Sequence, residues 1–269
     1  LDQSGISNIL LKGPFLSEQI YGDIALRPSR DIDIIVHPEN IEKTIVILLK
    51  EGYKMVYPDF SLSPKQKSFY QKHKNQMGLR NPSSRILIEV HWRLFSQTSL
   101  LPIPTDKVFA ESHEQIIAGK SIRVLSPAQK FEFLSLHGSI HQWFRLLWLR
   151  DISQILDKNL VNMDEVFICA KKNNNEKPIY QAILLSNHFF GTNYPVDEKS
   201  AKSVKSIVIH AATAIISEEK LTLSHKLTRI RLPIYKMKLK SGFIYKLSCW
   251  SILQPNFTDW KMVKLPDSL

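Results

Sequence analysis

The chain has only two cysteines, Cys169 and Cys249, among its 269 residues. Their number and spacing exclude a disulfide framework and a cysteine-based zinc site. Because nothing in the chain requires an oxidising compartment, we expect a cytoplasmic setting. No apolar run reaches about 18 residues, so no transmembrane helix is predicted, and no signal peptide is recognisable. The chain begins at Leu1 rather than Met, which leaves open whether native residues precede it.

Acidic residues are also scarce, above all near the C-terminus. The chain has 36 lysines and arginines against 25 aspartates and glutamates, a net charge of +11. The basic stretch, residues 220–246, has no acid and contains Lys220, Lys226, Arg229, Arg231, Lys236, Lys238, Lys240 and Lys246. Such a stretch favours a polyanionic partner such as nucleic acid, a membrane surface or an acidic peptide. A solvated helical face is the alternative interpretation.

Two aspartates, Asp31 and Asp33, stand two positions apart at the start of an apolar, β-branched run that ends at Val36. This run predicts a strand, so both carboxylates point to one face, about 7 Å apart. Two carboxylates this close are costly unless a cation lies between them. Oxygen ligands on a rigid strand suit Mg²⁺, which one or two carboxylates hold together with substrate phosphates. Two aspartates at an exposed strand end are the plainer alternative.

Basic residues precede these aspartates. The run Ile9–Pro14 predicts a short strand that ends in a turn and leads into a helix. Such a joint offers the backbone N–H groups around Gly13 to an anion, and Lys12 stands where an ammonium could reach a phosphate. Arg27 and Arg30 carry guanidinium groups, which match phosphate oxygens. A plain turn and a surface ion network are the alternatives.

A third carboxylate lies inside the apolar run of residues 85–92. This is Glu89, and His91 shares its face of the predicted strand. A lone buried glutamate would become neutral. A glutamate that faces the two aspartates across neighbouring strands would complete a metal site of three carboxylates. Pairing with a neighbouring arginine at the strand end is the alternative.

The most apolar part of the chain predicts one long helix over residues 127–156, opened by Ser126 and Pro127. Its predicted core stripe is Leu136, Ile140, Phe144 and Leu147. Polar side chains recur on another face or flank it: His137, His141, Arg145 and Asp151. No third ligand follows the two histidines at a suitable spacing, so a zinc site is rejected. These side chains could form a polar stripe at the interdomain surface, or they could be core histidines whose hydrogen bonds are satisfied. They could also form a face that binds the acceptor or phosphates, and all of these interpretations stay open.

Taken in order, these motifs resemble the uncharacterised nucleotidyltransferase family of the DNA polymerase β superfamily. The order is Leu-Lys-Gly, Tyr-Gly, Leu-Arg-Pro-x-Arg-Asp-Ile-Asp-Ile-Ile-Val, Glu-Val-His-Trp and His-Gly-x-x-His-x-Trp-x-Arg-Leu-x-Trp-Leu-x-Asp-Ile. The resemblance covers roughly residues 8 to 155. Pro14 follows Gly13 where most of the superfamily has serine, so we assign part of the phosphate-binding role to Lys12.

The resemblance implies an α+β fold, with a small mixed sheet and flanking helices followed by an α-helical C-terminal domain. We expect a nucleotidyltransferase domain over residues 1–125, a helical domain over 126–219 and a basic C-terminal segment over 220–269. The implied cofactors are Mg²⁺ or Mn²⁺, with a nucleoside triphosphate (NTP) as co-substrate.

The resemblance also assigns roles to individual residues. Catalysis and metal binding fall to Asp31, Asp33 and Glu89. The triphosphate would be bound by Lys12, Gly13, Arg27 and Arg30. The candidate residues of an acceptor cleft are His91, His137, His141, Arg145 and Asp151.

The implied activity is transfer of a nucleotidyl or phosphoryl group to an acceptor hydroxyl. The carboxylates do not decide between these two groups. One implied acceptor is a peptide hydroxyl, as in natural-product tailoring, and another is protein or RNA, as in toxin–antitoxin relatives. A non-catalytic module that binds nucleic acid is the remaining hypothesis, although such a module has no use for three carboxylates. Nucleic acid is therefore not the favoured partner.

Overall fold

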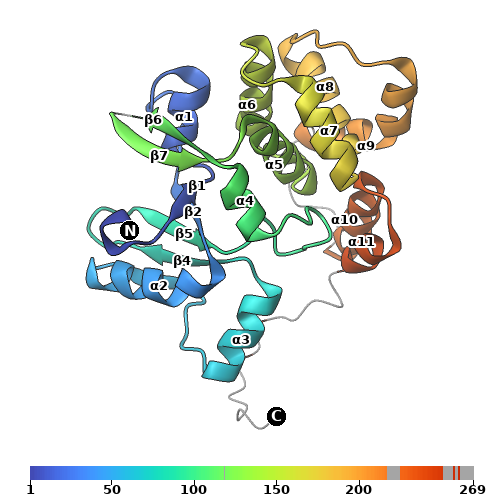
Figure 1. Cartoon of the computed structure of the whole chain (residues 1–269). Coiled ribbons are helices and arrows are strands. Elements are labelled where there is room, and N and C mark those ends of the chain that lie inside the picture. The colour runs from blue at the N-terminus through green and yellow to red at the C-terminus, as the bar shows by residue number, and fades with distance from the viewer. Residues whose placement is uncertain (118, 217–224, 251–256, 258–259, 261–269) are drawn as a thin grey trace. The chain divides into compact units, whose positions relative to one another are not determined.

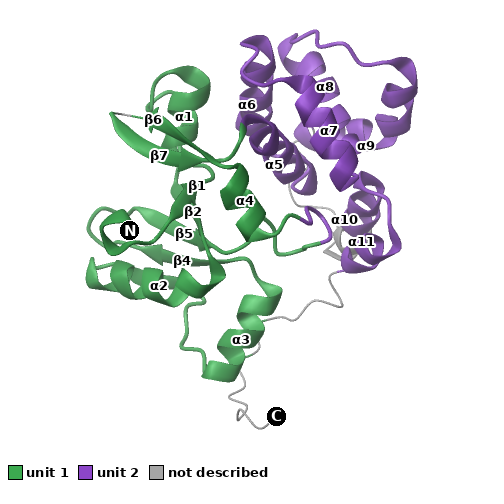
Figure 2. Ribbon diagram, viewed as in Figure 1, with its two compact units in different colours: residues 1–98, 103–126, 254–269 green, residues 99–102, 127–253 purple. Residues whose placement is uncertain are grey.

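A computed structural model of the whole chain shows strands in the N-terminal half and helices in the C-terminal half (Figure 1). It describes residues 1–117, 119–216, 225–250, 257 and 260, and only the backbone at 225–230. The chain divides into two compact units (Figure 2): unit 1 has residues 1–98, 103–126 and 254–269, and unit 2 has residues 99–102 and 127–253. The three domains expected from the sequence stay a prediction. No helix in the described ranges is long and apolar enough to cross a membrane.

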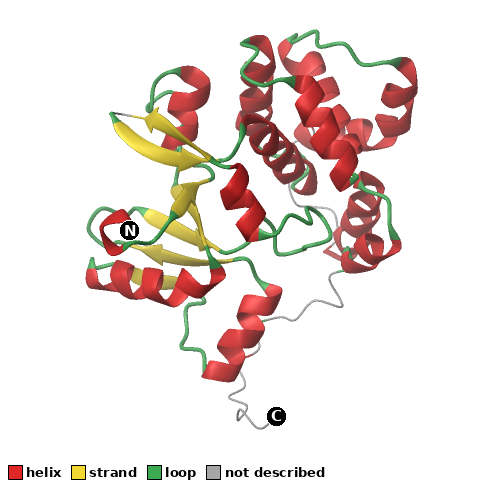
Figure 3. Ribbon diagram, viewed as in Figure 1, coloured by secondary structure: helices red, strands yellow, loops and turns green. Residues whose placement is uncertain are grey.

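Unit 1 is built on a mixed sheet of seven strands, in the order β3-β4-β5-β2-β1-β7-β6 (Figure 3). The strands are β1 (Asn8–Leu10), β2 (Asp31–Val36), β3 (Lys54–Tyr57), β4 (Gln76–Arg80), β5 (Leu87–His91), β6 (His113–Ile117) and β7 (Lys120–Val124). The pairs β2–β5 and β1–β7 are parallel and the others antiparallel. With the helices that follow, this sheet confirms the predicted α+β fold class.

The central position of β2 explains its sequence. Ile34, Ile35 and Val36 are consecutive and all buried, which requires apolar cover on both faces of the sheet. Ile34 and Val36 share a core with Met77, Leu79 and Val90 from the neighbouring strands β4 and β5. The β-branched run therefore fixes the strand, and its first residues carry the two aspartates.

The helices of unit 1 are η1 (Asp2–Ser4), α1 (Pro14–Tyr21), η2 (Pro38–Asn40), α2 (Ile41–Lys50), α3 (Pro64–His73) and α4 (Thr105–Glu111). The polar composition of residues 58–68 by itself predicts a loop, but helix α3 begins at Pro64, so that expectation is wrong from Pro64 onward. Ser63 Oγ accepts the backbone N–H of Gln66, and the Gln66 side chain accepts the N–H of Ser63. This reciprocal capping, with proline at the first position, begins α3.

The helices of unit 2 are α5 (Pro127–Ile140), α6 (Leu146–Asp157), α7 (Met163–Asn173), α8 (Glu176–Phe190), α9 (Glu198–Ile216), α10 (His225–Leu239) and α11 (Phe243–Ser248). The single long helix predicted over residues 127–156 is wrong, because a turn separates α5 from α6. Gln142 and Trp143 in this turn have φ of 57° and 54°, a conformation that bulky residues rarely adopt.

Burial of Trp143 accounts for the turn. Its side chain is fully buried, and its Nε1–H donates to Gln181 Oε1 at 3.3 Å. The ring lies so close to Gly138 that a Cβ there would come within 2.3 Å of it. Phe144 is left 58% exposed, so its predicted place in the core stripe is wrong, whereas Leu136 is fully buried.

The basic stretch divides between α10 and α11. Lys220 lies outside the described residues, and the side chains of Lys226 and Arg229 lie outside them too. Lys240 is buried, and its Nζ donates to the carbonyl of Leu100 at 2.9 Å, so it is part of the packing of unit 2. Among the side chains of the basic stretch that the structure describes, the exposed basic ones are Arg231, Lys238 and Lys246.

Candidate functional site

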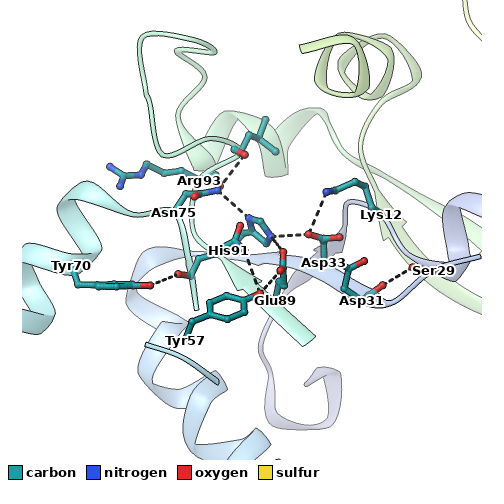
Figure 4. Close-up of polar contacts among 12 residues, drawn as sticks. Lys12, Ser29, Asp31, Asp33, Tyr57, Tyr70, Asn75, Glu89, His91 and Arg93 are labelled. Carbon is teal, nitrogen blue, oxygen red and sulfur yellow. Dashed lines mark hydrogen bonds and ion pairs between the residues drawn. The ribbon is translucent and has the colours of Figure 1, made fainter. Parts of the chain in front are cut away.

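The parallel pairing of β2 with β5 places Asp33 directly beside Glu89. Paired residues on parallel strands point to the same face of the sheet, and Asp31 points there too because it precedes Asp33 by two positions. Figure 4 shows all three carboxylates and the His91 ring on this side of the sheet. The structure therefore brings together the carboxylates that the sequence singled out.

Asp33 is fully buried and its two carboxylate oxygens differ in their surroundings. Oδ1 lies 3.0 Å from His91 Nε2 and 3.6 Å from Lys12 Nζ. Oδ2 is buried and has no hydrogen-bond partner among the described residues. Burial alone would raise the pKa of Asp33, but Lys12 and His91 outweigh it and hold this pKa well below its usual range. The carboxylate is therefore ionised, with one buried oxygen left for a cation.

Glu89 is held by a tyrosine from two strands away. The Tyr57 hydroxyl donates to Glu89 Oε1, while His91 Nε2 lies 3.5 Å from Oε2. The Tyr57 ring crosses β4 at Gly78, where a Cβ would come within 2.2 Å of it. Burial first, and then Glu89, raise the pKa of Tyr57. The phenol therefore stays protonated and remains a donor to the carboxylate.

His91 is held from behind by Asn75. Its ring is 4% exposed, and its Nδ1 lies 3.2 Å from Asn75 Nδ2. The same amide nitrogen donates to the carbonyls of Arg93 at 3.3 Å and Leu94 at 3.4 Å. Burial lowers the pKa of His91, but its bonds to Asp33 and Glu89 outweigh burial and raise it.

Sequence reasoning missed two of these contacts, those of Tyr57 and Asn75. Both come from segments that carry no motif, and their contacts depend on how β3, β4 and β5 pair. One signal was available in Gly78, since a glycine inside a strand often marks a close approach of another group.

The joint between β1 and α1 lies against β2, the strand that carries Asp31 and Asp33. Gly13 has φ of 103°, and a Cβ there would come within 3.0 Å of the Asp31 carbonyl oxygen, so only glycine fits without strain. The Leu11 N–H donates to the carbonyl of Asp33 at 2.9 Å. These contacts place Lys12 and the N-terminus of α1 beside the carboxylates.

The two predicted arginines differ in exposure. Arg27 is 6% exposed, and its backbone N–H donates to Ser17 Oγ at 2.9 Å. Arg30 is exposed and directly precedes β2. Ser29, between them, donates from Oγ to the carbonyl of Asp31 at 2.8 Å.

The predicted stripe on the long helix becomes an aromatic cluster in unit 2. His137 lies 4.8 Å from His141 and 4.6 Å from Trp148, measured between ring centroids. The Arg145 guanidinium lies 5.4 Å from the centroids of the Phe144 and Trp148 rings. Because the helix breaks after α5, these residues do not share one continuous helical face. Asp151 is fully buried inside unit 2.

The carboxylates of Asp31, Asp33 and Glu89 and the imidazole of His91 together make up what we call the sheet site. They form a group of candidate metal ligands. One atom each from Asp33, Glu89 and His91 lies within 4.8 Å of the others, and Asp31 stands beside this group (Figure 4). Carboxylate oxygens are the ligands that Mg²⁺ and Mn²⁺ prefer. The buried Asp33 Oδ2 fits a cation because a buried ionised oxygen without a partner is costly.

Comparisons with known proteins connect the chain to one protein family. No curated protein matches the chain. Among solved structures, it is similar to an antigenic nucleotidyltransferase-like protein from Paracoccidioides brasiliensis, at 15% identity and a TM-score of 0.37. That match covers 71% of this chain and 91% of the other. The profile of one protein family, described as uncharacterised nucleotidyltransferase, matches residues 1–191, which include both the sheet site and the aromatic cluster. The chain therefore belongs to this nucleotidyltransferase family.

Proposed function

We propose that this chain transfers a nucleotidyl group from an NTP to an acceptor hydroxyl, with Mg²⁺ held by Asp31, Asp33 and Glu89. The observation that carries the proposal is the buried, ionised Asp33, whose Oδ2 has no hydrogen-bond partner among the described residues. A divalent cation bound there would polarise the phosphate and lower the pKa of the acceptor hydroxyl. Mn²⁺ accepts the same oxygen ligands and is the expected substitute.

The residues beside the carboxylates would bind the triphosphate. Lys12 supplies an ammonium within 3.6 Å of Asp33, and the N-terminus of α1 at Gly13 presents backbone N–H groups to an anion. Arg27 and Arg30 precede β2 and would add guanidinium contacts to phosphate oxygens. Binding of this kind orients the α-phosphorus toward the acceptor and stabilises the charge of the leaving group.

Glu89 would receive the proton of the acceptor hydroxyl. The acceptor oxygen then forms a bond to the α-phosphorus, and the bond from the α-phosphorus to the bridging oxygen breaks. Pyrophosphate leaves with that pair of electrons and is stabilised by Lys12 and the arginines. Catalysis of this kind depends on positioning and electrostatics and needs no covalent nucleophile in the protein.

The acceptor class that we propose is a peptide hydroxyl, which rests on the family resemblance. Mass spectrometry of candidate peptides, incubated with each NTP and Mg²⁺, tests both the group and the acceptor. Addition of a nucleoside monophosphate supports the proposal, whereas addition of a single phosphate replaces nucleotidyl with phosphoryl transfer. Modification of RNA or protein with no modified peptide would overturn the acceptor class. Asp106→Asn is the control for substitutions of the site aspartates and should keep the activity, because Asp106 is 90% exposed and lies outside the sheet site.

A further inference from the structure

The sheet site has one imidazole, that of His91, beside its carboxylates, and this imidazole has two contrasting roles open to it. Histidine is a common ligand of transition metals through a nitrogen lone pair. It can also stand behind a ligand, since a carboxylate that binds a metal is itself held by hydrogen bonds, which a ring N–H can donate. The surroundings of His91 decide between these roles.

The orientation of the Asn75 amide is fixed by two backbone carbonyls. The oxygens of Arg93 and Leu94 lie 3.3 and 3.4 Å from Nδ2 of Asn75. Carbonyl oxygens only accept hydrogen bonds, so the amide atom that faces them must be the NH₂ group. That NH₂ group also lies 3.2 Å from His91 Nδ1. Nδ1 therefore faces a donor and must accept.

It follows that the ring hydrogen is on Nε2. In a neutral imidazole one nitrogen donates and the other accepts, and in a protonated ring Nε2 carries a hydrogen as well. Nε2 lies 3.0 Å from Asp33 Oδ1, and Glu89 Oε2 is more distant at 3.5 Å. A nitrogen that carries hydrogen has no lone pair for a metal. The opposite tautomer would direct an Nδ1–H group against the NH₂ group of Asn75.

We propose that His91 is a positioning residue, which donates from Nε2 to Asp33 and does not coordinate the metal, while Asn75 holds it in the required tautomer. This inference rests on the proposed metal-dependent function. The bond to Oδ1 fixes the rotation of the carboxylate and leaves Oδ2, which is buried and without a hydrogen-bond partner in the described structure, directed at the cation. Lys12 supports the same oxygen Oδ1 from another side.

The test uses Mn²⁺ as a paramagnetic probe of the full chain. Pulsed electron paramagnetic resonance detects the ¹⁴N nucleus of a directly coordinated imidazole. We expect bound Mn²⁺ without such a ¹⁴N coupling. A ¹⁴N coupling that disappears in His91→Gln would show coordination by His91 and overturn the inference, while the proposed function would stand. If the chain binds no Mn²⁺, with or without ATP, the inference and the proposed function both fail.

Two substitutions add a second readout, the affinity for Mn²⁺. The amide NH₂ of glutamine can occupy the place of Nε2, so His91→Gln should keep the affinity within about 3-fold, whereas His91→Leu should lower it roughly 10–100-fold. His73→Gln is the control, because His73 lies on α3, where its Nδ1 bonds the carbonyl of Phe69. Equal losses in both His91 variants would contradict the positioning role. If His91→Leu does not fold, the spectrum of the native chain alone decides.

Discussion

The sheet site and the aromatic cluster of unit 2 hold their ionisable groups in opposite ways. In the sheet site, Asp33 and His91 are buried, and the pKa of each is shifted by the other. In the aromatic cluster, His141 and Arg145 are exposed and contact rings. Burial makes each charge of the sheet site costly unless a specific partner is present. The sheet site therefore points to a ligand by its own energetics, whereas the aromatic cluster would be stable without one.

The largest expected effect separates the two regions by activity. We expect Asp33→Asn to lower nucleotidyl transfer by about 10³-fold or more, because an amide is a poor ligand for Mg²⁺ and carries no charge. The substitution Arg145→Gln in the aromatic cluster should leave the affinity for NTP unchanged. The rate of transfer at saturating Mg²⁺, with circular dichroism to confirm folding, measures the first effect, and calorimetric titration with NTP measures the second. Full activity in Asp33→Asn would remove Asp33 from the metal site.

A second prediction reverses the comparison and concerns stability. We expect Trp143→Ala to lower the free energy of unfolding by about 3–5 kcal/mol, since it empties the space of a fully buried ring. Phe144→Ala, at the neighbouring exposed position, should cost less than about 1 kcal/mol. Urea unfolding measures both variants. Similar costs for the two would contradict the anchoring role of Trp143 in the turn.

The sequence predicted the placement of Asp33 and Glu89 on neighbouring strands better than it predicted the helices, because the two depend on different information. Asp33 and Glu89 each lie in a short apolar run that predicts a strand. Because alternate residues of a strand point to the same face, the sequence indicates which side chains share a face with each carboxylate. The break after α5 depends on the burial of Trp143 against Gly138 and Gln181. Helical spacing over residues 127–156 carries no sign of that contact, so one long helix was the natural expectation.

Other misses have similar causes. Ser63, Pro64 and Gln66 form a recognisable start signal for helix α3. The polar composition of this segment nevertheless favours a loop. The contacts of Tyr57 with Glu89 and of Asn75 with His91 join separate strands, so no local pattern reveals them.

A third prediction concerns the support of Glu89. We expect Gly78→Ala to displace the Tyr57 ring, because the added Cβ would come within 2.2 Å of it. Overpacking of this kind should cost about 1–3 kcal/mol of stability. Gly78→Ala and Tyr57→Phe should both lower the rate of transfer, by about 10-fold or more. Only Tyr57→Phe should do so without that loss of stability. If Gly78→Ala has native activity, the contact between Tyr57 and Glu89 does not matter for transfer.

A fourth prediction follows from the lowered pKa of Asp33. Its pKa is 3.8 without interactions and lies below that value in the folded chain. Ionised Asp33 therefore stabilises the fold above about pH 4, and this contribution is lost as the pH falls toward the folded pKa. Metal-free Asp33→Asn should be less stable than the native chain at pH 7, and the difference should shrink from about pH 5 downward. A difference that grows on acidification would contradict the assigned shift.

The smallest expected effect concerns the exposed basic side chains of unit 2. Replacing Arg231, Lys238 and Lys246 with serine should raise the KM for an acidic acceptor by a few fold and flatten its salt dependence, since such attraction is screened over about 8 Å at physiological salt. The KM for NTP should not change. An increase in the KM for NTP alone would assign these side chains to the nucleotide, and no change in either KM would leave them as a solvated surface.

The most direct test of the account is the position of Mn²⁺ in crystals of the full chain grown with Mn²⁺ and a non-hydrolysable NTP analogue. Anomalous scattering locates the ion without reference to any assumed ligand. The account predicts a peak bonded to Asp33 Oδ2 and Glu89, with the triphosphate beside Lys12. A peak elsewhere, or no peak at saturating Mn²⁺ and nucleotide, would contradict it.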